Sequence, residues 1–206
     1  KVGTVGIPID NVEVKIADDG EVLIKGPNVM MGYYKDPEKT ASVMTDDYFH
    51  TGDKGEIDPE GFLKITGRKK EMFKTSGGKY IIPPLLEGYL KQSRFIEQAM
   101  VIGEGEKMPA AFIQPNFEFV SEWIERKKKN IGNSPEAICA SEEVINRIQK
   151  EVDNCNKHFG KWEQIKRFEL TPVIWSIDSG HLTPTMKMKR DVIKNIHKEL
   201  YDKIYN

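Results

Sequence analysis

The sequence lacks the features that define several large classes of protein. Its 2 cysteines, Cys139 and Cys155, form no C-x-x-C pair, so we expect reduced thiols and neither a structural zinc nor a dithiol redox site. No apolar run approaches the length needed to cross a bilayer, and we expect no signal peptide. The 4 histidines are scattered without ligand-like spacing, so we predict no metal site. Together these absences favour a cytoplasmic protein.

The sequence also has no excess of positive or negative charge. Lys and Arg number 31 and Asp and Glu 32, so the net charge is -1, and no overall field would attract nucleic acid or an anionic membrane. One basic run, Arg-Lys-Lys-Lys at 126–129, lies at the end of a predicted amphipathic helix, where cations suit the helix dipole. No aromatic stacking platform accompanies it. We predict no nucleic-acid partner, and keep a non-enzymatic interaction module as an alternative reading.

The first third of the chain reads as strands and tight turns. Residues 12–16 alternate apolar and polar side chains, and residues 21–25 read as the return strand after an Asp-Asp-Gly turn. A second hairpin is predicted within 56–65. The Asp-Pro-Glu sequence at 36–38 is typical of a helix start. Residues 1–67 are therefore predicted to be β-rich apart from one short helix.

The residue pattern changes after Gly67 from strand-like sequence to a polar, basic segment, and we place a domain boundary there. Residues 68–206 are predicted to form a smaller domain with a short sheet flanked by helices, so the overall class is α+β. Predicted strands lie at 99–103, 110–114, 168–170 and 173–175. Predicted helices lie at 83–92, from 117 to 124, from 141 to 152 with Ser141 as N-cap, and from 192 to 204.

Several glycine-bearing and basic segments could carry chemistry. Thr-Gly-Asp at 51–53 places Asp53 after a predicted glycine turn, where a carboxylate can accept hydrogen bonds from a ribose diol. The segment 67–79 surrounds glycine N–H groups with cations, which suits phosphate. The segment 182–190 is a basic turn entering the last helix. Taken singly, each segment has a plain alternative as a surface turn, a solvated linker or a helix flank.

In this order the segments resemble the C-terminal third of the adenylate-forming superfamily, which includes acyl-CoA synthetases, firefly luciferase and peptide-synthetase adenylation domains. The matching motifs are Thr-Gly-Asp at 51–53, Gly-Arg-Lys-Lys at 67–70, Lys-Thr-Ser-Gly at 74–77 and the lysine at 187. The ending Leu-Thr-Pro-Thr-Met-Lys-Met-Lys-Arg and the helical stretch between Phe117 and Trp162 are most similar to long-chain-fatty-acid–CoA ligases.

The resemblance implies a role for each matching residue. Asp53 matches the aspartate that binds the ribose hydroxyls of ATP and of the acyl-adenylate, and Arg68 an arginine that helps to hold the nucleotide. Lys70 matches the hinge about which the small domain swings. Lys187 matches the catalytic lysine of adenylation, with Lys189 as a competitor for that role.

The glycine-rich loop of the smaller domain has an implied role as well. Lys74, Gly77 and Gly78 match the loop brought to the active site for thioester formation. The parent activity implied is ATP + fatty acid + CoA to acyl-CoA + AMP + pyrophosphate, through an acyl-adenylate. The alternative within the superfamily is a ligase for a short-chain, aromatic or amino acid.

Other parts of the superfamily pattern are missing from the sequence. The phosphate loop, the segment that helps to hold Mg²⁺ and the acyl pocket all precede Lys1 in the superfamily. We therefore expect a C-terminal fragment that is inactive alone and whose partner is the N-terminal domain of the same polypeptide. The resemblance leaves open the acyl chain length, the oligomeric state and peripheral membrane contact of the parent.

Overall fold

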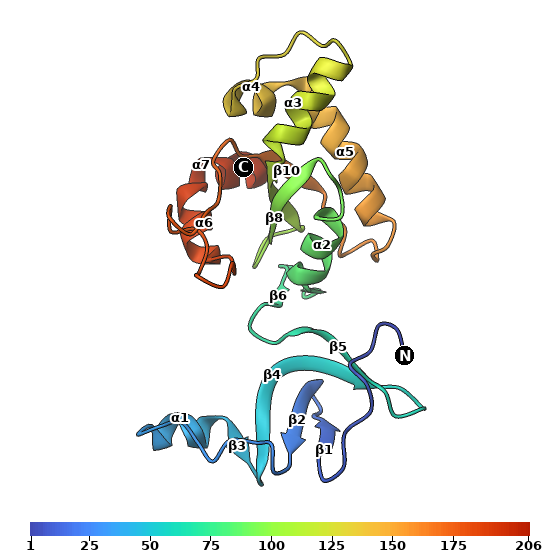
Figure 1. Ribbon diagram of the computed structural model, residues 1–206, viewed down its shortest axis with the longest axis vertical. Helices are drawn as coiled ribbons and strands as arrows, with labels where there is room; N and C mark the ends of the chain where they lie inside the picture. The colour runs from blue at the N-terminus through green and yellow to red at the C-terminus, as the bar shows by residue number, and fades with distance from the viewer. The chain divides into compact units, whose positions relative to one another are not determined.

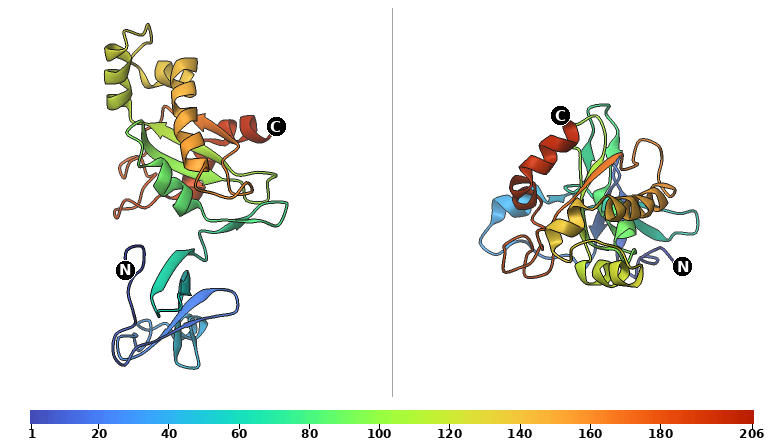
Figure 2. Two further views of the ribbon diagram at one scale, coloured as in Figure 1. Left: turned by 90° about the vertical axis from the view of Figure 1, so that its right-hand side faces the viewer. Right: turned by 90° about the horizontal axis from the view of Figure 1, so that it is seen from above.

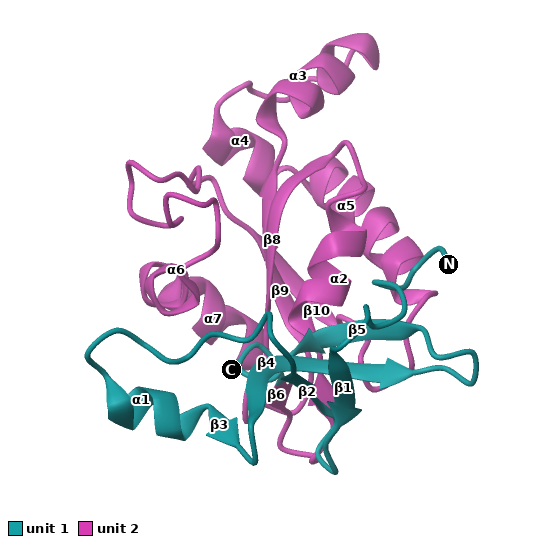
Figure 3. Ribbon diagram, turned by 60° about the horizontal axis from the view of Figure 1, so that its bottom comes forward, with its two compact units in different colours: residues 1–72 teal, residues 73–206 magenta.

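The computed structural model describes residues 1–206 and divides into two compact units, residues 1–72 and 73–206 (Figure 3). The division falls after Met72, whereas the sequence analysis placed it after Gly67. Residues 68 and 69 stay with the first unit because they continue its sheet: Arg68 pairs with Asp53, and the Lys69 N–H donates to the Gly52 carbonyl at 2.7 Å.

The first unit is an antiparallel sheet with one helix. Its strands follow the order β1-β2-β4-β3, and β5 pairs with β4. The elements are β1 (Glu13–Ile16), β2 (Glu21–Lys25), α1 (Pro37–Ser42), β3 (Met44–Thr45), β4 (Tyr48–Ile57) and β5 (Leu63–Arg68). The start of α1 is as predicted: the Asp36 carboxylate accepts from the Lys39 N–H at 2.9 Å, and Pro37 occupies the first turn.

Few side chains of the first unit are buried. Its buried apolar residues are Val22, Leu23 and Leu63, and only Val22 is fully buried. Val2 and Met31 are each 103% exposed relative to the reference residue. This unit therefore has little hydrophobic core, and its order must come mainly from backbone pairing and polar contacts.

The second unit is built on a three-stranded sheet in the order β10-β9-β8. Strands β8 (Ile96–Ile102) and β9 (Ala110–Pro115) are antiparallel, and β10 (Arg167–Leu170) adds parallel to β9. A short hairpin, β6 (Phe73–Lys74) and β7 (Tyr80–Ile81), precedes them. The helices are α2 (Pro83–Leu90), α3 (Phe117–Arg126), α4 (Pro135–Ala140), α5 (Glu142–Asn156), α6 (Arg190–Ile196) and α7 (Lys198–Tyr205).

Both faces of this sheet are covered. Figure 1 and Figure 2 show α2 and α5 on one side and α6 and α7 on the other. Strand alternation explains the arrangement: Val101 and Ile113 belong to the apolar cluster under α2 to α5, and Met100 and Phe112 to the cluster under α6 and α7. The expected α+β class is confirmed.

Two local predictions for the second unit were wrong. Residues 173–175 form no strand, because β9 ends at Pro115 and the Trp175 N–H donates instead to the Gln114 side chain at 2.9 Å. The last helix is two helices, interrupted at His197. Helix α4 was not foreseen. No helix combines the length and the apolarity that membrane crossing requires.

Candidate functional site

The Thr-Gly-Asp segment lies within β4 rather than after a turn, which corrects the expected setting of Asp53. The break in regularity is at Gly52, whose φ of 72° favours glycine, and the register shifts nearby, between Lys54 and Gly55. Asp53 faces Arg68 across the ladder, with 3.0 Å between Arg68 Nε and Asp53 Oδ1. The structure thus brings these two predicted nucleotide-binding residues together, both still accessible to solvent.

A buried carboxylate, which the sequence analysis missed, supports this segment. Glu21 is 4% exposed, and its Oε1 accepts from the Gly52 N–H at 2.9 Å. Its Oε2 lies 3.1 Å from His50 Nδ1 and 2.9 Å from Lys69 Nζ. Thr51 adds a second tie, since its Oγ1 donates to the Val22 carbonyl at 2.7 Å. The two residues before Asp53 are therefore both anchored to β2.

The charges around Lys69 stabilise one another. Lys69 Nζ lies 2.7 Å from Asp19 Oδ2 as well as 2.9 Å from Glu21. The Lys69 hydrogen bond lowers the pKa of Asp19 to about 2. Burial opposes ionisation of Glu21, but the hydrogen bonds from Lys69, His50 and Gly52 outweigh it, so its pKa lies below the ordinary value. The chain is fixed up to Lys69, one residue before the predicted hinge at Lys70.

The β6–β7 hairpin brings Lys74, Gly77 and Gly78 into one turn. The Thr75 N–H donates to the Lys79 carbonyl at 3.0 Å, and the Gly78 N–H to the Thr75 carbonyl at 2.9 Å. Gly78 has a φ of 74°, which suits glycine. Lys74 Nζ lies 4.7 Å from the centroid of the Tyr80 ring. This turn presents its backbone and its lysine to solvent, as a loop that meets an anionic ligand would.

Two backbone hydrogen bonds tie this hairpin to the β8–β9 loop. Ser76 N–H donates to the Glu106 carbonyl and Gly105 N–H to the Lys74 carbonyl, both at 2.8 Å. The β6–β7 turn is therefore held against the sheet rather than free at its ends.

Lys187 lies on a separate tight turn. Leu182 and Met188 form an isolated antiparallel bridge, and Leu182 is 2% exposed. The Thr183 N–H donates to the Lys187 carbonyl at 2.8 Å, and the Lys187 N–H to Thr183 Oγ1 at 3.0 Å. Lys187 and Lys189 are both exposed and neither forms an ion pair. The backbone of this turn is thus tightly held while its ammonium groups are available.

A partly buried ion pair fixes the turn to the rest of the unit. Nη1 and Nη2 of Arg190 contact the Glu87 carboxylate, at 2.8 and 2.7 Å. Glu87 Oε1 also accepts from the Val101 N–H at 2.8 Å. The bidentate geometry joins the start of α6 to α2 and β8. Arg190 is therefore an anchor, three residues from the exposed Lys187.

A histidine network lies between the sheet and the same turn. His197 Nε2 accepts from Trp175 Nε1 at 3.0 Å and lies 3.3 Å from Thr171 Oγ1. Burial lowers the pKa of His197, with a smaller contribution from His181. His181 is 4% exposed, and its Nδ1 lies 2.5 Å from Ser179 Oγ. These contacts satisfy the buried polar groups where the closing helix breaks.

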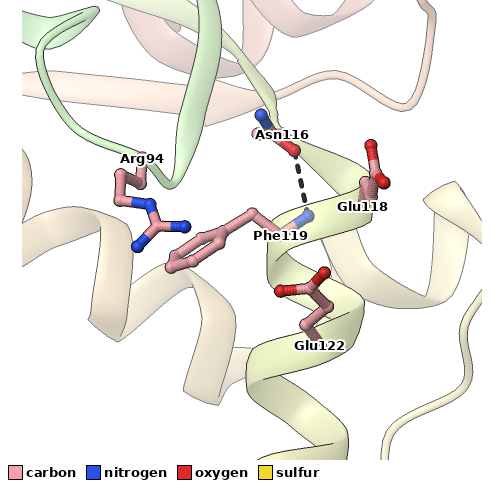
Figure 4. Close-up of a pocket in the computed structure, with 5 residues that line it drawn as sticks. All are labelled: Arg94, Asn116, Glu118, Phe119 and Glu122. Carbon is pink, nitrogen blue, oxygen red and sulfur yellow. Dashed lines mark hydrogen bonds between the residues drawn. The ribbon is translucent and has the colours of Figure 1, made fainter.

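None of the predicted site residues lines the pocket shown in Figure 4. That pocket, of about 310 Å³, is formed by Arg94, Asn116, Glu118, Phe119 and Glu122. Arg94 lies over the Phe119 ring at 4.3 Å, and the Asn116 side chain accepts from the Phe119 N–H at 3.0 Å as the cap of α3. These contacts give Arg94, Asn116 and Phe119 a structural role. No group of three metal-ligating side chains occurs either.

Three comparisons with known proteins bear on the site. The model of the AMP-binding enzyme C-terminal domain family matches residues 71–206. Long-chain-fatty-acid–CoA ligase FadD15 of Mycobacterium tuberculosis is 39% identical over 206 residues, which cover 100% of this chain and 34% of that protein. Long-chain-fatty-acid–CoA ligase 1 of Homo sapiens is 36% identical over 219 residues, covering 99% and 31%. The chain spans about a third of the length of these curated relatives.

Solved structures share the fold. The adenylation domain of a carboxylate reductase from Mycobacterium chelonae has a TM-score of 0.75 at 24% identity and covers 97% of this chain and 31% of that one. O-succinylbenzoate coenzyme A synthetase from Bacillus subtilis, in complex with AMP, has a TM-score of 0.66 at 23% identity, covering 93% and 35%.

Proposed function

The chain belongs to the family of AMP-binding enzyme C-terminal domains, and from that membership we propose that it is the C-terminal part of a fatty acid:CoA ligase. The reaction proposed is ATP + fatty acid + CoA to acyl-CoA + AMP + pyrophosphate, through an acyl-adenylate. The curated relatives named above, both long-chain-fatty-acid–CoA ligases, support this choice of acid over a short-chain, aromatic or amino acid.

The observation that carries the proposal is the setting of Lys187. Its turn is closed by two hydrogen bonds between Thr183 and Lys187 and is held by the Arg190–Glu87 ion pair, yet the Lys187 ammonium group has no partner. A cation on a rigid support is what adenylation needs, because a carboxylate must approach the α-phosphate of ATP and the negative charges must be offset. Lys187 is proposed to stabilise that charge.

The first unit is proposed to hold the nucleotide. The Asp53 carboxylate can accept from the two hydroxyls of a ribose, and Arg68 lies beside it at 3.0 Å. Pairing with Arg68 limits the rotation of the carboxylate. The residues present therefore fit a ribose diol.

The second half-reaction is proposed to use the β6–β7 turn. Lys74, Gly77 and Gly78 offer an exposed cation and an open backbone, and rotation about Lys70 would exchange this turn for Lys187 near the adenylate. CoA is the proposed co-substrate. Mg²⁺ is proposed to bind in the part of the enzyme that precedes Lys1 in the relatives, as is the fatty acid.

The test uses the full-length enzyme and separates the two half-reactions. Pyrophosphate release from ATP and a fatty acid reports adenylation, and acyl-CoA formation from supplied acyl-AMP reports thioester formation. Lys187→Ala is expected to slow adenylation by about 10²–10³-fold, the effect of removing one group that stabilises developing charge. Thioester formation is expected to persist.

Lys189→Ala is the matched control, since Lys189 is an equally exposed lysine two residues away. If Lys189→Ala abolishes adenylation and Lys187→Ala does not, the roles are reversed. A wild-type enzyme that releases pyrophosphate only with short-chain or aromatic acids would overturn the fatty-acid assignment. Release by the 206-residue chain alone would contradict its predicted inactivity.

A further inference from the structure

We propose that Glu21 is a positioning residue whose single carboxylate fixes both the nucleotide-binding strand and the start of the linker at Lys69. The proposal rests on the proposed function and deepens it. Strand β2 then positions two parts of the site that are separate in the sequence. These are the Asp53 segment and Lys69, the residue just before the predicted hinge.

One oxygen of the Glu21 carboxylate, Oε1, holds strand β4 next to Asp53. Glu21 Oε1 accepts from the Gly52 N–H at 2.9 Å, and the residue that follows is Asp53. Gly52 has a φ of 72°, so the strand departs there from extended geometry and its N–H turns away from the regular ladder. Without this acceptor the Gly52 N–H would lose its tie to β2, and the direction of the Asp53 side chain would be less well defined.

The other oxygen of the carboxylate, Oε2, holds Lys69, where the linker begins. Glu21 Oε2 accepts from Lys69 Nζ at 2.9 Å, and the Lys69 N–H donates to the Gly52 carbonyl at 2.7 Å. Asp19 adds a contact to the same ammonium at 2.7 Å. Lys69 is therefore held through its side chain and its backbone, and both attachments lead back to the Glu21–Gly52 pair. Rotation of the chain is confined to the residues after it.

Burial makes Glu21 different from the other acidic residues of this unit. Its side chain is 6% exposed, whereas that of Asp19 is 46% exposed and that of Glu56 is 62% exposed. A buried carboxylate with three donors, Gly52 N–H, His50 and Lys69, is a fixed point, because moving any donor leaves part of the charge without a partner. The three donors lie 31, 29 and 48 residues away in the sequence.

The experiment compares Glu21→Ala and Glu21→Gln in the full-length enzyme. Glu21→Ala removes both functions, so the KM for ATP in pyrophosphate release is expected to rise about tenfold, as expected for loss of a charged hydrogen-bond acceptor. The kcat per active site is expected to change much less. Tryptic cleavage after Lys69, followed by mass spectrometry, is expected to become faster.

Glu21→Gln separates the two functions. Its amide oxygen can still accept from the Gly52 N–H, so the KM for ATP is expected to stay near wild type, while the neutral amide no longer attracts Lys69 and cleavage is expected to be as fast as in Glu21→Ala. This variant also keeps the test open if Glu21→Ala does not fold. Glu56→Gln is the control, because it removes an exposed ion pair with Lys64 on the same sheet.

The outcomes distinguish this proposal from the proposed function. If wild type and Glu21→Ala have the same KM for ATP and the same cleavage rate, Glu21 is not a positioning residue. A lower fraction of active enzyme with an unchanged KM means a merely structural role and also overturns the proposal. Wild-type enzyme that releases no pyrophosphate with any acid overturns the proposed function instead, and cleavage after Lys69 still tests the anchoring of the linker.

Discussion

The first unit, residues 1–72, and the second, residues 73–206, are held together by different forces. The first buries three apolar side chains, at 22, 23 and 63, and surrounds one buried carboxylate with donors. The second packs two apolar clusters on opposite faces of a sheet. The stability of the first unit is therefore sensitive to the loss of single hydrogen bonds and to changes of charge. The stability of the second unit is sensitive to the loss of side-chain volume in its core.

The difference matches the tasks proposed for the two units. A nucleotide-binding surface needs polar groups in fixed directions, and the Glu21 network supplies them. A domain that rotates as a body needs internal rigidity, and close packing on both faces of β9 supplies it. All three tryptophans, at 123, 162 and 175, belong to the second unit. Tryptophan fluorescence therefore monitors that unit alone.

The largest effect is expected from a cavity in the second unit. Phe112 is fully buried between the sheet and helices α6 and α7, so Phe112→Ala is expected to lower the free energy of unfolding by about 3–5 kcal/mol. Urea denaturation followed by tryptophan fluorescence measures it. The comparison is Ile65→Ala in the first unit, where the side chain is 38% exposed; amide hydrogen exchange at Gly52 measures its effect, because the tryptophans do not report on that unit. A loss as large for Ile65→Ala would break the contrast between the units.

The next effect concerns the Arg190–Glu87 ion pair, which joins α6 to α2 in the second unit and whose carboxylate is buried. Arg190→Met leaves Glu87 buried without its cation and is expected to cost about 3 kcal/mol. The same fluorescence experiment measures it. Changing both residues, Arg190→Met with Glu87→Met, is expected to recover part of the loss, because no uncompensated charge remains. If the double variant is less stable than the single one, packing rather than charge decides this contact.

A smaller effect is expected from crowding the sheet of the first unit. A Cβ at Gly55 would lie 2.7 Å from Val22 Cγ2 and 2.8 Å from the Lys64 carbonyl oxygen, so Gly55→Ala is expected to cost about 1–3 kcal/mol. Amide hydrogen exchange at Gly52 reports it, while tryptophan fluorescence should not change. Gly61→Ala is a poor control because its φ is 87°, so Lys64→Ala at the exposed end of β5 serves instead.

The smallest expected effect is a difference in acid sensitivity. In the second unit, burial keeps the pKa of folded His197 below its ordinary 6.5, so the unfolded chain binds more protons and stability falls as pH drops through 6.5. In the first unit, Asp19 has a pKa of about 2 against an ordinary 3.8, and the pKa of Glu21 is also lowered from 4.5. Their contribution is complete above about pH 4.5 and lost toward pH 2.

Acid titration followed by tryptophan fluorescence and by amide exchange at Gly52 checks that the second unit loses stability at a higher pH than the first. Tryptophan fluorescence should show the second unit losing stability to urea between pH 7 and 5, while the protection factor of the Gly52 amide, which corrects for the intrinsic pH dependence of exchange, stays constant. His197→Asn should remove that slope. A slope that persists in the variant would mean that another group of the second unit titrates.

Local patterns predicted much of both units, and long-range contacts account for the failures. The α1 start, the β8–β9 hairpin and the Pro83 helix were predictable because capping, alternation and proline act within a few residues. Residues 173–175 have the composition of a strand, but whether a strand forms depends on a partner, and β9 ends before it can supply one.

The candidate site shows the same limit. The positions of Asp53, Arg68, Lys74 and Lys187 could be picked out from motifs, and their roles stay predictions. Glu21 could not be found, because its three donors lie 29 to 48 residues away in the sequence. The only local signal was a charged residue at the start of a strand, just before the apolar residues 22–24. The same holds for Glu87, which meets Arg190 at a separation of 103 residues.

The parallel pairing of β9 with β10 has a consequence for biosynthesis. Strand β9 is buried along its whole length and pairs with β8 soon after it leaves the ribosome, but its other edge waits until the three helices α3 to α5 and then β10 have been made. At translation rates of about 5–20 residues per second, that edge stays open for several seconds, with an apolar row and unpaired backbone groups. A nascent chain paused before Leu170 is thus expected to bind chaperones. A nascent chain long enough to include β10 is expected not to bind them.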